Sequence, residues 1–184
     1  MVKKTTENRA IFLDRDGVII YAPRNQNKPK SIRKPSEIKI FAKNITAIKK
    51  LSELFKIIVI TNQPDVARLN IKKSTVKKIN LILKKKLQIN KIYTCFHDNK
   101  DNCDCRKPKI GNIIKAKKKY NLNLKNSYFI GDRNSDMQAG KKAGCINYFI
   151  DRNYDEKKPD MKCCTYTKSL YSASVQILKY EKNK

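Results

Sequence analysis

The stretch "AIFLDRDGVII" at Ala10–Ile20 decides the fold, because a short apolar run gives way to three charged residues and a glycine before apolar residues resume. The run 10–13 is typical of a strand buried on both faces of a sheet. Asp14 and Asp16 follow directly and are two residues apart. In a chain that is still extended, their side chains leave on the same side and converge on one target. The stretch therefore predicts a strand that ends in a polar site.

Strand-like and helix-like patterns alternate along the rest of the chain. Further short β-branched and aromatic runs predict strands at 56–61, 91–96, 127–131 and 146–150. Segments with helical spacing or composition lie at 45–55, 76–87, 110–121, 135–144 and 170–180. Ser74 is the expected N-cap of the second helix, and Gly144 the expected end of the fourth. The alternation predicts an α/β fold, a doubly wound parallel sheet with helices on both faces.

The chain length of 184 residues suits a single domain, 1–184, which can bury roughly 70% of the surface that the unfolded chain exposes. We expect its core at about 10–150 and its C-terminal helix at about 168–181. No segment between the motifs is long enough for a separate large cap domain. No apolar run approaches a membrane span, and the basic start leads only into a four-residue apolar run. We therefore expect a cytoplasmic protein with no membrane partner, and favour a monomer.

Basic residues dominate the composition: 43 Lys and Arg stand against 16 Asp and Glu, a formal net charge of +27. Such a surface attracts phosphate in any form. One interpretation is a nucleic-acid-binding patch. The other is a solvated lysine surface that also draws in small anionic substrates, and we favour it because the basic residues are spread along the whole chain.

Polar clusters follow three of the predicted strands: "DRDG", "TNQ" and "GDRNSD". Ligands of such sheets bind beyond the carboxyl ends of the strands. A carboxylate can act as a nucleophile toward phosphorus, while a second carboxyl protonates the leaving oxygen and then deprotonates water. Two carboxylates that face a phosphate need a hard cation, and Asp132 could complete that Mg²⁺ site. The alternative is that Asp14 and Asp16 are only turn and cap residues.

A second constellation, "CFHDNKDNCDC", places Cys95, His97, Cys103 and Cys105 within eleven residues. Three thiolates and an imidazole make a closed tetrahedral Zn²⁺ site of a structural kind. A free cysteine is usually a small buried hydrophobic residue, but CxH followed by CxC across a polar loop is hard to explain by packing. The sequence therefore predicts an inserted zinc-binding loop.

Four motifs in order, "FLDRDGV", "VITNQ", "CRKP" and "IGDRNSD", carry a resemblance. The chain resembles the haloacid-dehalogenase-like hydrolase superfamily, and within it the D-glycero-D-manno-heptose 1,7-bisphosphate phosphatase and histidinol-phosphate phosphatase branch. The resemblance implies that Asp14 is the nucleophile, which forms an aspartyl-phosphate, and that Asp16 is the general acid and base. It also implies that Asp14, the main-chain carbonyl of Asp16 and Asp132 hold Mg²⁺.

The same resemblance implies roles for the other motif residues. Thr61 and Asn62 would bind the transferring phosphoryl group, and Lys107 would neutralise its charge. Arg106 would reach a second substrate anion, with the zinc loop holding Arg106 and Lys107 over the pocket. Asp136 would orient Lys107 or the metal waters; alternatively, it is only a first-turn acid favoured by the helix dipole.

The expected activity is thus Mg²⁺-dependent hydrolysis of a small sugar phosphate or bisphosphate, most like the heptose enzyme, with histidinol phosphate second. The alternative is a function directed at nucleic acid, as a polynucleotide 3′-phosphatase or a nucleic-acid-binding protein, because such phosphatases share the acidic motif and "TNQ". The basic loop 22–35 could recognise an additional phosphate, but solvated charge is the simpler interpretation. Cys145 is expected to pack in a strand. The side chains of Cys163 and Cys164 would point to opposite sides if the chain is extended there. No function is assigned to Cys145, Cys163 or Cys164.

Overall fold

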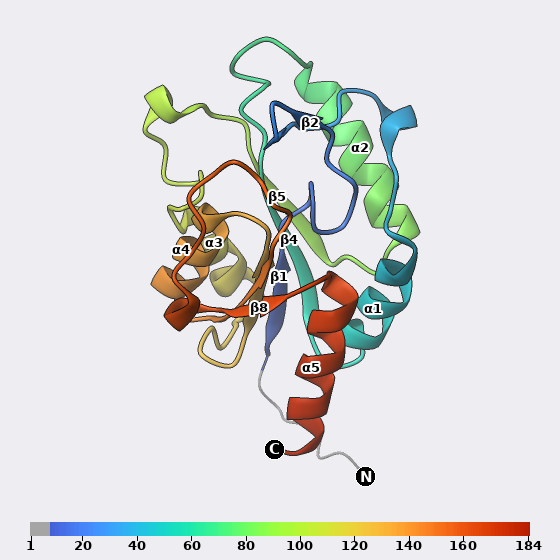
Figure 1. Ribbon diagram of the computed structural model, residues 1–184, viewed down its shortest axis with the longest axis vertical. Coiled ribbons are helices and arrows are strands. Elements are labelled where there is room, and N and C mark those ends of the chain that lie inside the picture. Colours follow the sequence, from blue (N-terminus) through green and yellow to red (C-terminus); the bar gives the residue numbers. More distant parts are fainter. Residues whose placement is uncertain (1–7) are drawn as a thin grey trace.

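A six-stranded parallel sheet runs through the centre of the protein (Figure 1). The computed structural model describes residues 8–184, so the basic segment 1–7 lies outside the described residues. The strands lie in the order β5-β4-β1-β6-β7-β8, and each neighbouring pair is parallel. Their bounds are β1 Ala10–Leu13, β4 Lys56–Asn62, β5 Lys91–Cys95, β6 Tyr128–Gly131, β7 Ile146–Ile150 and β8 Thr165–Thr167.

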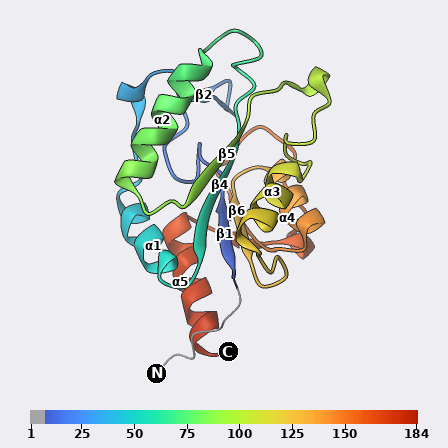
Figure 2. The same ribbon diagram turned by 180° about the vertical axis from the view of Figure 1, so that it is seen from behind.

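Helices cover both faces of this sheet (Figure 2). One face packs against α1 (Ala42–Ser52), α2 (Lys73–Lys86) and α5 (Leu170–Lys182). The other packs against α3 (Gly111–Tyr120) and α4 (Asn134–Ala143). The predicted doubly wound α/β fold is therefore confirmed.

The burial of β1 explains why its sequence is a continuous apolar run. Ile11 and Leu13 join the core under α1, α2 and α5. Ala10 and Phe12 point the other way and join the core under α3 and α4. All four side chains are fully buried, as expected of a central strand with helices on both faces.

The strand order reverses at β1. The next two sheet strands along the chain, β4 and β5, lie on one side of β1, and β6, β7 and β8 lie on the other. The crevice beyond the carboxyl ends of β1 and β6 is thus a topological switch point, where ligands of doubly wound sheets bind.

The connections that follow the carboxyl ends of the strands contain little regular structure. Between β1 and α1 the chain forms only the hairpin β2 (Arg24–Asn25) and β3 (Lys28–Pro29) and the 3₁₀ helix η1 (Pro35–Glu37), so no cap domain is inserted there. Two more 3₁₀ helices, η2 (Asn99–Asp101) and η3 (Met161–Cys163), precede α3 and β8. Among the described residues, no helix is both long and apolar enough to cross a bilayer.

Two expectations about helix ends had different outcomes. Gly144 does end α4, with a φ of 78° in the left-handed region that glycine adopts readily. The prediction for Ser74 was wrong, because Lys72 is the N-cap of α2 and no side chain caps that end.

Candidate active site and metal centres

Three carboxylates meet at the switch point. Asp14 directly follows β1, Asp132 directly follows β6, and Asp136 lies in the first turn of α4. All three are buried, and each offers an oxygen within 4.8 Å of the others'. The side chain of Asp136 also accepts hydrogen bonds from the backbone N–H groups of Asp132 and Arg133, at 3.2 and 3.0 Å, which fixes it against the helix start.

One buried ammonium group faces these carboxylates. The Nζ atom of Lys107 lies 2.6 Å from Asp14 Oδ1 and 2.7 Å from Asp136 Oδ1, and it donates to the backbone carbonyl of Ile60 at 2.7 Å. Burial by itself lowers the pKa of Lys107, but the carboxylates of Asp136 and Asp14 outweigh it and raise that pKa. Lys107 is therefore held as a cation between two acids.

The charge in this cluster is not balanced by Lys107 alone. Burial raises the pKa of Asp14 to about 6, against the opposing effect of Lys107. Burial and the charges of Asp14 and Asp136 raise the pKa of Asp132 well above its usual value. Three carboxylates against one ammonium leave two negative charges, which a divalent cation would neutralise.

The donor set fits Mg²⁺, a hard cation that prefers carboxylate and carbonyl oxygens. The Oδ1 atom of Asp132 is buried and, within the described part of the chain, has no hydrogen-bond partner. A buried carboxylate oxygen without a partner is costly, so this atom is a ready ligand for a metal ion.

Asp16 lies apart from this cluster, although it lines the same cleft as Asp14. Its carboxylate accepts from Nη2 of the fully buried Arg15, with the shortest contact 2.9 Å, and from Nε2 of Gln63 at 2.8 Å. The extended chain assumed for Asp14 and Asp16 ends at Arg15, whose carbonyl accepts from the backbone N–H of Ile20 in a turn. Strand alternation is therefore not what brings the two carboxylates together, but both line one cleft, as expected of residues with a common target.

Thr61 and Asn62 end β4 beside these groups. The hydroxyl oxygen of Thr61 accepts from Gln63 Nε2 at 2.9 Å. The Asn62 amide pairs with the backbone of Lys107: it donates to the carbonyl and accepts from the N–H, both at 3.1 Å. Asn62 thus connects the end of β4 to the lysine that neutralises Asp14.

A cleft opens over Asp14, Asp16 and Asp136, and its walls carry additional basic groups. The hairpin after β1 contributes Lys30, and the start of α4 contributes Arg133. Arg106 is not among the lining residues; its guanidinium donates to Asn99 Oδ1 at 2.7 Å and to the His97 carbonyl. The lining comprises Asp14, Asp16, Pro29, Lys30, Ser31, Asn62, Lys107, Arg133, Ser135 and Asp136.

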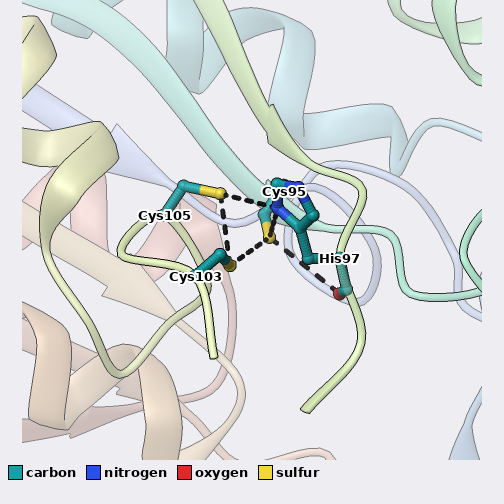
Figure 3. A group of neighbouring side chains, drawn as sticks. All are labelled: Cys95, His97, Cys103 and Cys105. Carbon is teal, nitrogen blue, oxygen red and sulfur yellow. Dashed lines mark hydrogen bonds between the residues drawn. The ribbon is translucent and has the colours of Figure 1, made fainter. Parts of the chain in front are cut away.

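The second cluster joins the end of β5 to the loop before α3 (Figure 3). The Sγ atoms of Cys95 and Cys103 are 3.6 Å apart, and those of Cys103 and Cys105 are 3.5 Å apart. Nδ1 of His97 lies 3.3 Å from Cys105 Sγ and 3.7 Å from Cys95 Sγ. Sulfur atoms at these separations are far beyond disulfide bonding distance.

These separations fit the edges of a zinc tetrahedron. With Zn–S near 2.3 Å and Zn–N near 2.0–2.1 Å, such edges measure about 3.6–3.8 Å. Burial opposes ionisation of Cys103, but hydrogen bonds with Cys105 and Cys95 prevail and lower its pKa to about 7. The cluster therefore has the composition and spacing of a structural Zn²⁺ site, as the sequence predicted.

The loop that carries these ligands is also tied to the segment after β4. Both oxygens of Asp98 accept from the Arg68 guanidinium, each at 2.7 Å. The sequence pattern did not point to either residue. Arg68 and Asp98 meet only because the fold brings their two loops together. Arg15 and Gln63 were also missed as partners of Asp16, although both belong to quoted motifs.

The remaining cysteines are placed differently from expectation. Cys145 lies just before β7 rather than within a strand, and packs beside the core under α3 and α4. Cys163 belongs to η3, so the extended geometry considered for Cys163 and Cys164 does not occur; their Sγ atoms are 3.9 Å apart and both residues pack against that same core.

Comparison with known proteins gives consistent matches. Residues 9–176 match the family model described as "Polynucleotide kinase 3 phosphatase". The chain is 38% identical over 161 residues to a D-glycero-alpha-D-manno-heptose-1,7-bisphosphate 7-phosphatase of Campylobacter jejuni, a match that covers 84% of this chain and 88% of that protein. This chain belongs to the haloacid-dehalogenase-like phosphatases.

Other members of this superfamily are similar to the chain in sequence or fold. A D-glycero-beta-D-manno-heptose-1,7-bisphosphate 7-phosphatase of Helicobacter pylori (strain J99) is 34% identical, with 79% of this chain and 84% of that protein covered. A solved structure, D,D-heptose 1,7-bisphosphate phosphatase from B. bronchiseptica complexed with magnesium and phosphate, has a TM-score of 0.79 and 24% identity. It covers 94% of this chain and 99% of that chain, so the two share their fold.

Proposed function

We propose that this phosphatase hydrolyses a small sugar phosphate or bisphosphate in a Mg²⁺-dependent reaction, with a heptose 1,7-bisphosphate as the foremost candidate. The observation that carries the proposal is the cluster of three buried carboxylates and one lysine at the switch point, in a chain 38% identical to a heptose-bisphosphate phosphatase. Such a cluster has a nucleophile, a cation to neutralise it and a place for a divalent ion.

Asp14 is the proposed nucleophile. Its carboxylate oxygen attacks phosphorus, the bond to the leaving oxygen breaks, and Asp16 gives that oxygen a proton. Asp16 then takes a proton from water, which attacks phosphorus and releases inorganic phosphate and free Asp14. A Mg²⁺ ion held by Asp14, the main-chain carbonyl of Asp16 and Asp132 would offset the negative charge on the transferring phosphoryl group.

The surrounding residues have supporting roles in this proposal. Lys107 keeps the carboxylate of Asp14 ionised and neutralises charge that collects on the phosphoryl oxygens. Asp136 holds Lys107 from the other side, at 2.7 Å. Thr61 and Asn62 bind the phosphoryl group, and Asn62 also fixes the backbone of Lys107 through its paired hydrogen bonds.

Zn²⁺ held by Cys95, His97, Cys103 and Cys105 has a structural role in this account. All four positions of its tetrahedron are filled by the protein, so no open position is left for substrate. The ion would fix the loop on which Arg106 precedes Lys107. Arg106 contacts that loop through Asn99, which supports a role in holding the loop. The contact of Arg106 with a second substrate anion rests on the resemblance alone, because Arg106 does not line the cleft.

Two other substrates follow from specific observations. The chain is 31% identical to a histidine biosynthesis bifunctional protein HisB of Blochmanniella floridana, a match that covers 74% of this chain and 39% of that protein. The description of the matching family model names a polynucleotide phosphatase, and the net charge of +27 would suit binding to the end of a nucleic acid. Histidinol phosphate and a 3′-phosphorylated oligonucleotide are therefore the alternatives to a sugar phosphate.

A phosphatase panel tests this proposal. The purified protein is assayed with Mg²⁺ against a heptose 1,7-bisphosphate, its monophosphate, histidinol phosphate and a 3′-phosphorylated oligonucleotide. We expect the sugar bisphosphate to have the highest kcat/KM and Asp14→Asn to be inactive on every substrate. A higher kcat/KM for the oligonucleotide, with salt-sensitive binding in a gel shift, would assign the protein to nucleic-acid ends instead.

A further inference from the structure

The segment of residues 151–156, which follows β7 and which we name the strap, has no part in the chemistry above. It lies against the active-site end of the sheet through hydrogen bonds to separate parts of the chain. Arg152 Nε donates to the carbonyl of Gly17 at 2.8 Å, and the carboxylate of Glu156 accepts from Arg133 Nε at 2.9 Å. The strap thus joins the turn after β1 to the start of α4.

The strap is also joined to the hairpin that borders the cleft. Asn27, in the β2–β3 turn, donates from its side chain to the carbonyl of Asn153 at 2.8 Å. Its own carbonyl accepts from the backbone N–H of Asp155 at 3.2 Å. The guanidinium of Arg24 lies over the ring of Tyr154, with Cζ 5.4 Å from the ring centroid. Both neighbours of Tyr154 are therefore anchored, and its ring is covered.

Tyr154 uses this anchored position to contact Asp132. Its hydroxyl donates to Asp132 Oδ2 at 2.9 Å. Gly17 packs closely against the same oxygen of Asp132. A Cβ atom built on Gly17 would lie 1.8 Å from Asp132 Oδ2 and 2.7 Å from the Tyr154 hydroxyl oxygen. Gly17 also has a φ of +84°, so a side chain there would be strained as well as excluded. One oxygen of Asp132 is thus enclosed between Tyr154 and Gly17.

The other oxygen of Asp132 is left for a ligand. Oδ1 is buried and has no hydrogen-bond partner among the described residues, and the Asp132 carboxylate belongs to the cluster with Asp14 and Asp136. Because the Tyr154 hydroxyl occupies Oδ2, rotation of the carboxylate is restricted and Oδ1 is the oxygen left without a hydrogen bond from the described residues. The hydroxyl therefore selects which oxygen is offered to a cation.

We propose that Tyr154 is a positioning residue for the metal site: its hydroxyl orients Asp132 for Mg²⁺, and the strap couples that orientation to the β2–β3 hairpin. This inference rests on the proposed Mg²⁺ site at Asp14 and Asp132. Groups that hydrogen-bond metal ligands in this way typically change metal affinity by roughly 10–100-fold when removed.

Tyr154→Phe tests the inference, with Tyr166→Phe as the matched control. The Tyr166 hydroxyl also donates at 2.9 Å, but to the carbonyl of Pro159, away from the carboxylates. Each variant, with its zinc retained, is freed of Mg²⁺ and titrated with MgCl₂ alone by calorimetry. We expect Tyr154→Phe to weaken Mg²⁺ binding by roughly 10–100-fold and Tyr166→Phe to leave it unchanged. In turnover, Tyr154→Phe should require more Mg²⁺ while kcat at saturating Mg²⁺ is preserved.

The titration separates failure of this inference from failure of the metal site itself. Asp132→Asn is titrated in parallel and should lose Mg²⁺ binding. Equal Mg²⁺ affinity in the wild type and Tyr154→Phe, with binding lost in Asp132→Asn, would overturn the role of Tyr154 alone. Absence of Mg²⁺ binding in the wild type would overturn the proposed metal site and the inference with it. A comparable loss of affinity in Tyr166→Phe would reduce the effect to general destabilisation and also overturn the inference.

Discussion

The two clusters that could hold metal ions are built in opposite ways. Asp14 is distant in sequence from Asp132 and Asp136, all three are buried, and Asp14 and Asp136 share Lys107. The cysteine cluster comes from eleven consecutive residues, mixes buried and exposed side chains, and consists only of thiols and an imidazole. The first is assembled by the sheet and carries excess negative charge. The second lies at the end of β5 and in the one loop between β5 and α3.

Because of this difference, loss of the metal ion should affect the two clusters differently. Asp14 and Asp132 stand at the ends of fully buried strands and Asp136 in the first turn of α4, so the backbone holds all three in place with or without an ion. The cysteine loop has few buried side chains apart from Cys95 and Lys107 to hold it. We therefore expect loss of Mg²⁺ to stop chemistry with the fold intact, and loss of Zn²⁺ to loosen the loop.

The largest effect is expected at Asp14. Asp14→Asn should abolish turnover, a loss on the order of 10⁴-fold or more, because an amide cannot attack phosphorus at a useful rate. Initial rates of phosphate release measure it, and circular dichroism checks the fold. Turnover near that of the wild type, in a preparation free of contaminating phosphatase, would refute the proposed nucleophile.

A smaller loss is expected at Asp16. Asp16→Asn should reduce kcat by roughly 10²–10⁴-fold, the usual contribution of a positioned acid and base. A substrate with a good leaving group, such as an aryl phosphate, should lose less, because its leaving oxygen does not need the proton. Equal losses on both substrates would speak against Asp16 as the acid.

Chelation should separate the two clusters. EDTA should remove activity that added Mg²⁺ restores, while zinc bound through thiolates should remain until strong chelators or acid are used, since its ligands must stay deprotonated. Elemental analysis after each treatment measures both metals. The matched variants are Cys105→Ser, which should lose zinc, and Cys145→Ser, outside the cluster, which should keep it. Protein purified without chelators that contains no zinc would contradict the structural site.

The pH dependence of stability gives the smallest effect. The pKa of Asp14 rises from 3.8 to about 6 on folding, chiefly through burial, so the Mg²⁺-free folded protein binds more protons than the unfolded chain between these values. The free energy of unfolding should therefore fall as pH rises through that window, by on the order of 3 kcal/mol, and Asp14→Asn should reduce the slope. Urea unfolding in EDTA across the window tests this; identical slopes in both proteins would contradict it.

The cysteine loop contains a carboxylate that titrates in the opposite sense. Hydrogen bonds from Arg68 lower the pKa of Asp98 to about 2, so its contribution to stability is lost only as pH falls below the usual range of an aspartate. Both groups are acidic residues in loops at the same end of the protein. Burial in one and an exposed guanidinium in the other give the opposite signs.

The sequence predicted five of the six sheet strands because they are rich in apolar, β-branched and aromatic residues. β1 and β7 occur at the predicted bounds, and their carboxyl ends fix where polar residues collect. The missed strand β8 has only three residues, Thr165–Thr167, with threonines on either side of Tyr166, so no apolar run marks it. Ser74 was assigned as a cap from its residue type alone, although the helix begins one residue earlier.

The candidate site was predictable where one motif follows one strand. Asp14, Asp132 and Lys107 meet as expected because the strand order brings their motifs to one edge. The contacts of Asp16 were not predictable, because the turn after Arg15 directs its side chain to a buried arginine. The role of Tyr154 could not be predicted for a different reason. Tyr154 lies in an irregular segment, and only the folded chain brings its hydroxyl to Asp132.

The central claim, that the carboxylate at the end of β1 takes the phosphoryl group, is tested most directly by trapping that group. The protein is mixed with Mg²⁺ and a heptose 1,7-bisphosphate, quenched during turnover and treated with borohydride, which reduces an acyl phosphate to an alcohol. Peptide mass spectrometry should then find Asp14 converted to homoserine, only in samples that received substrate. Reduction at a different carboxylate, with Asp14 unmodified in a preparation that turns over, would contradict the account.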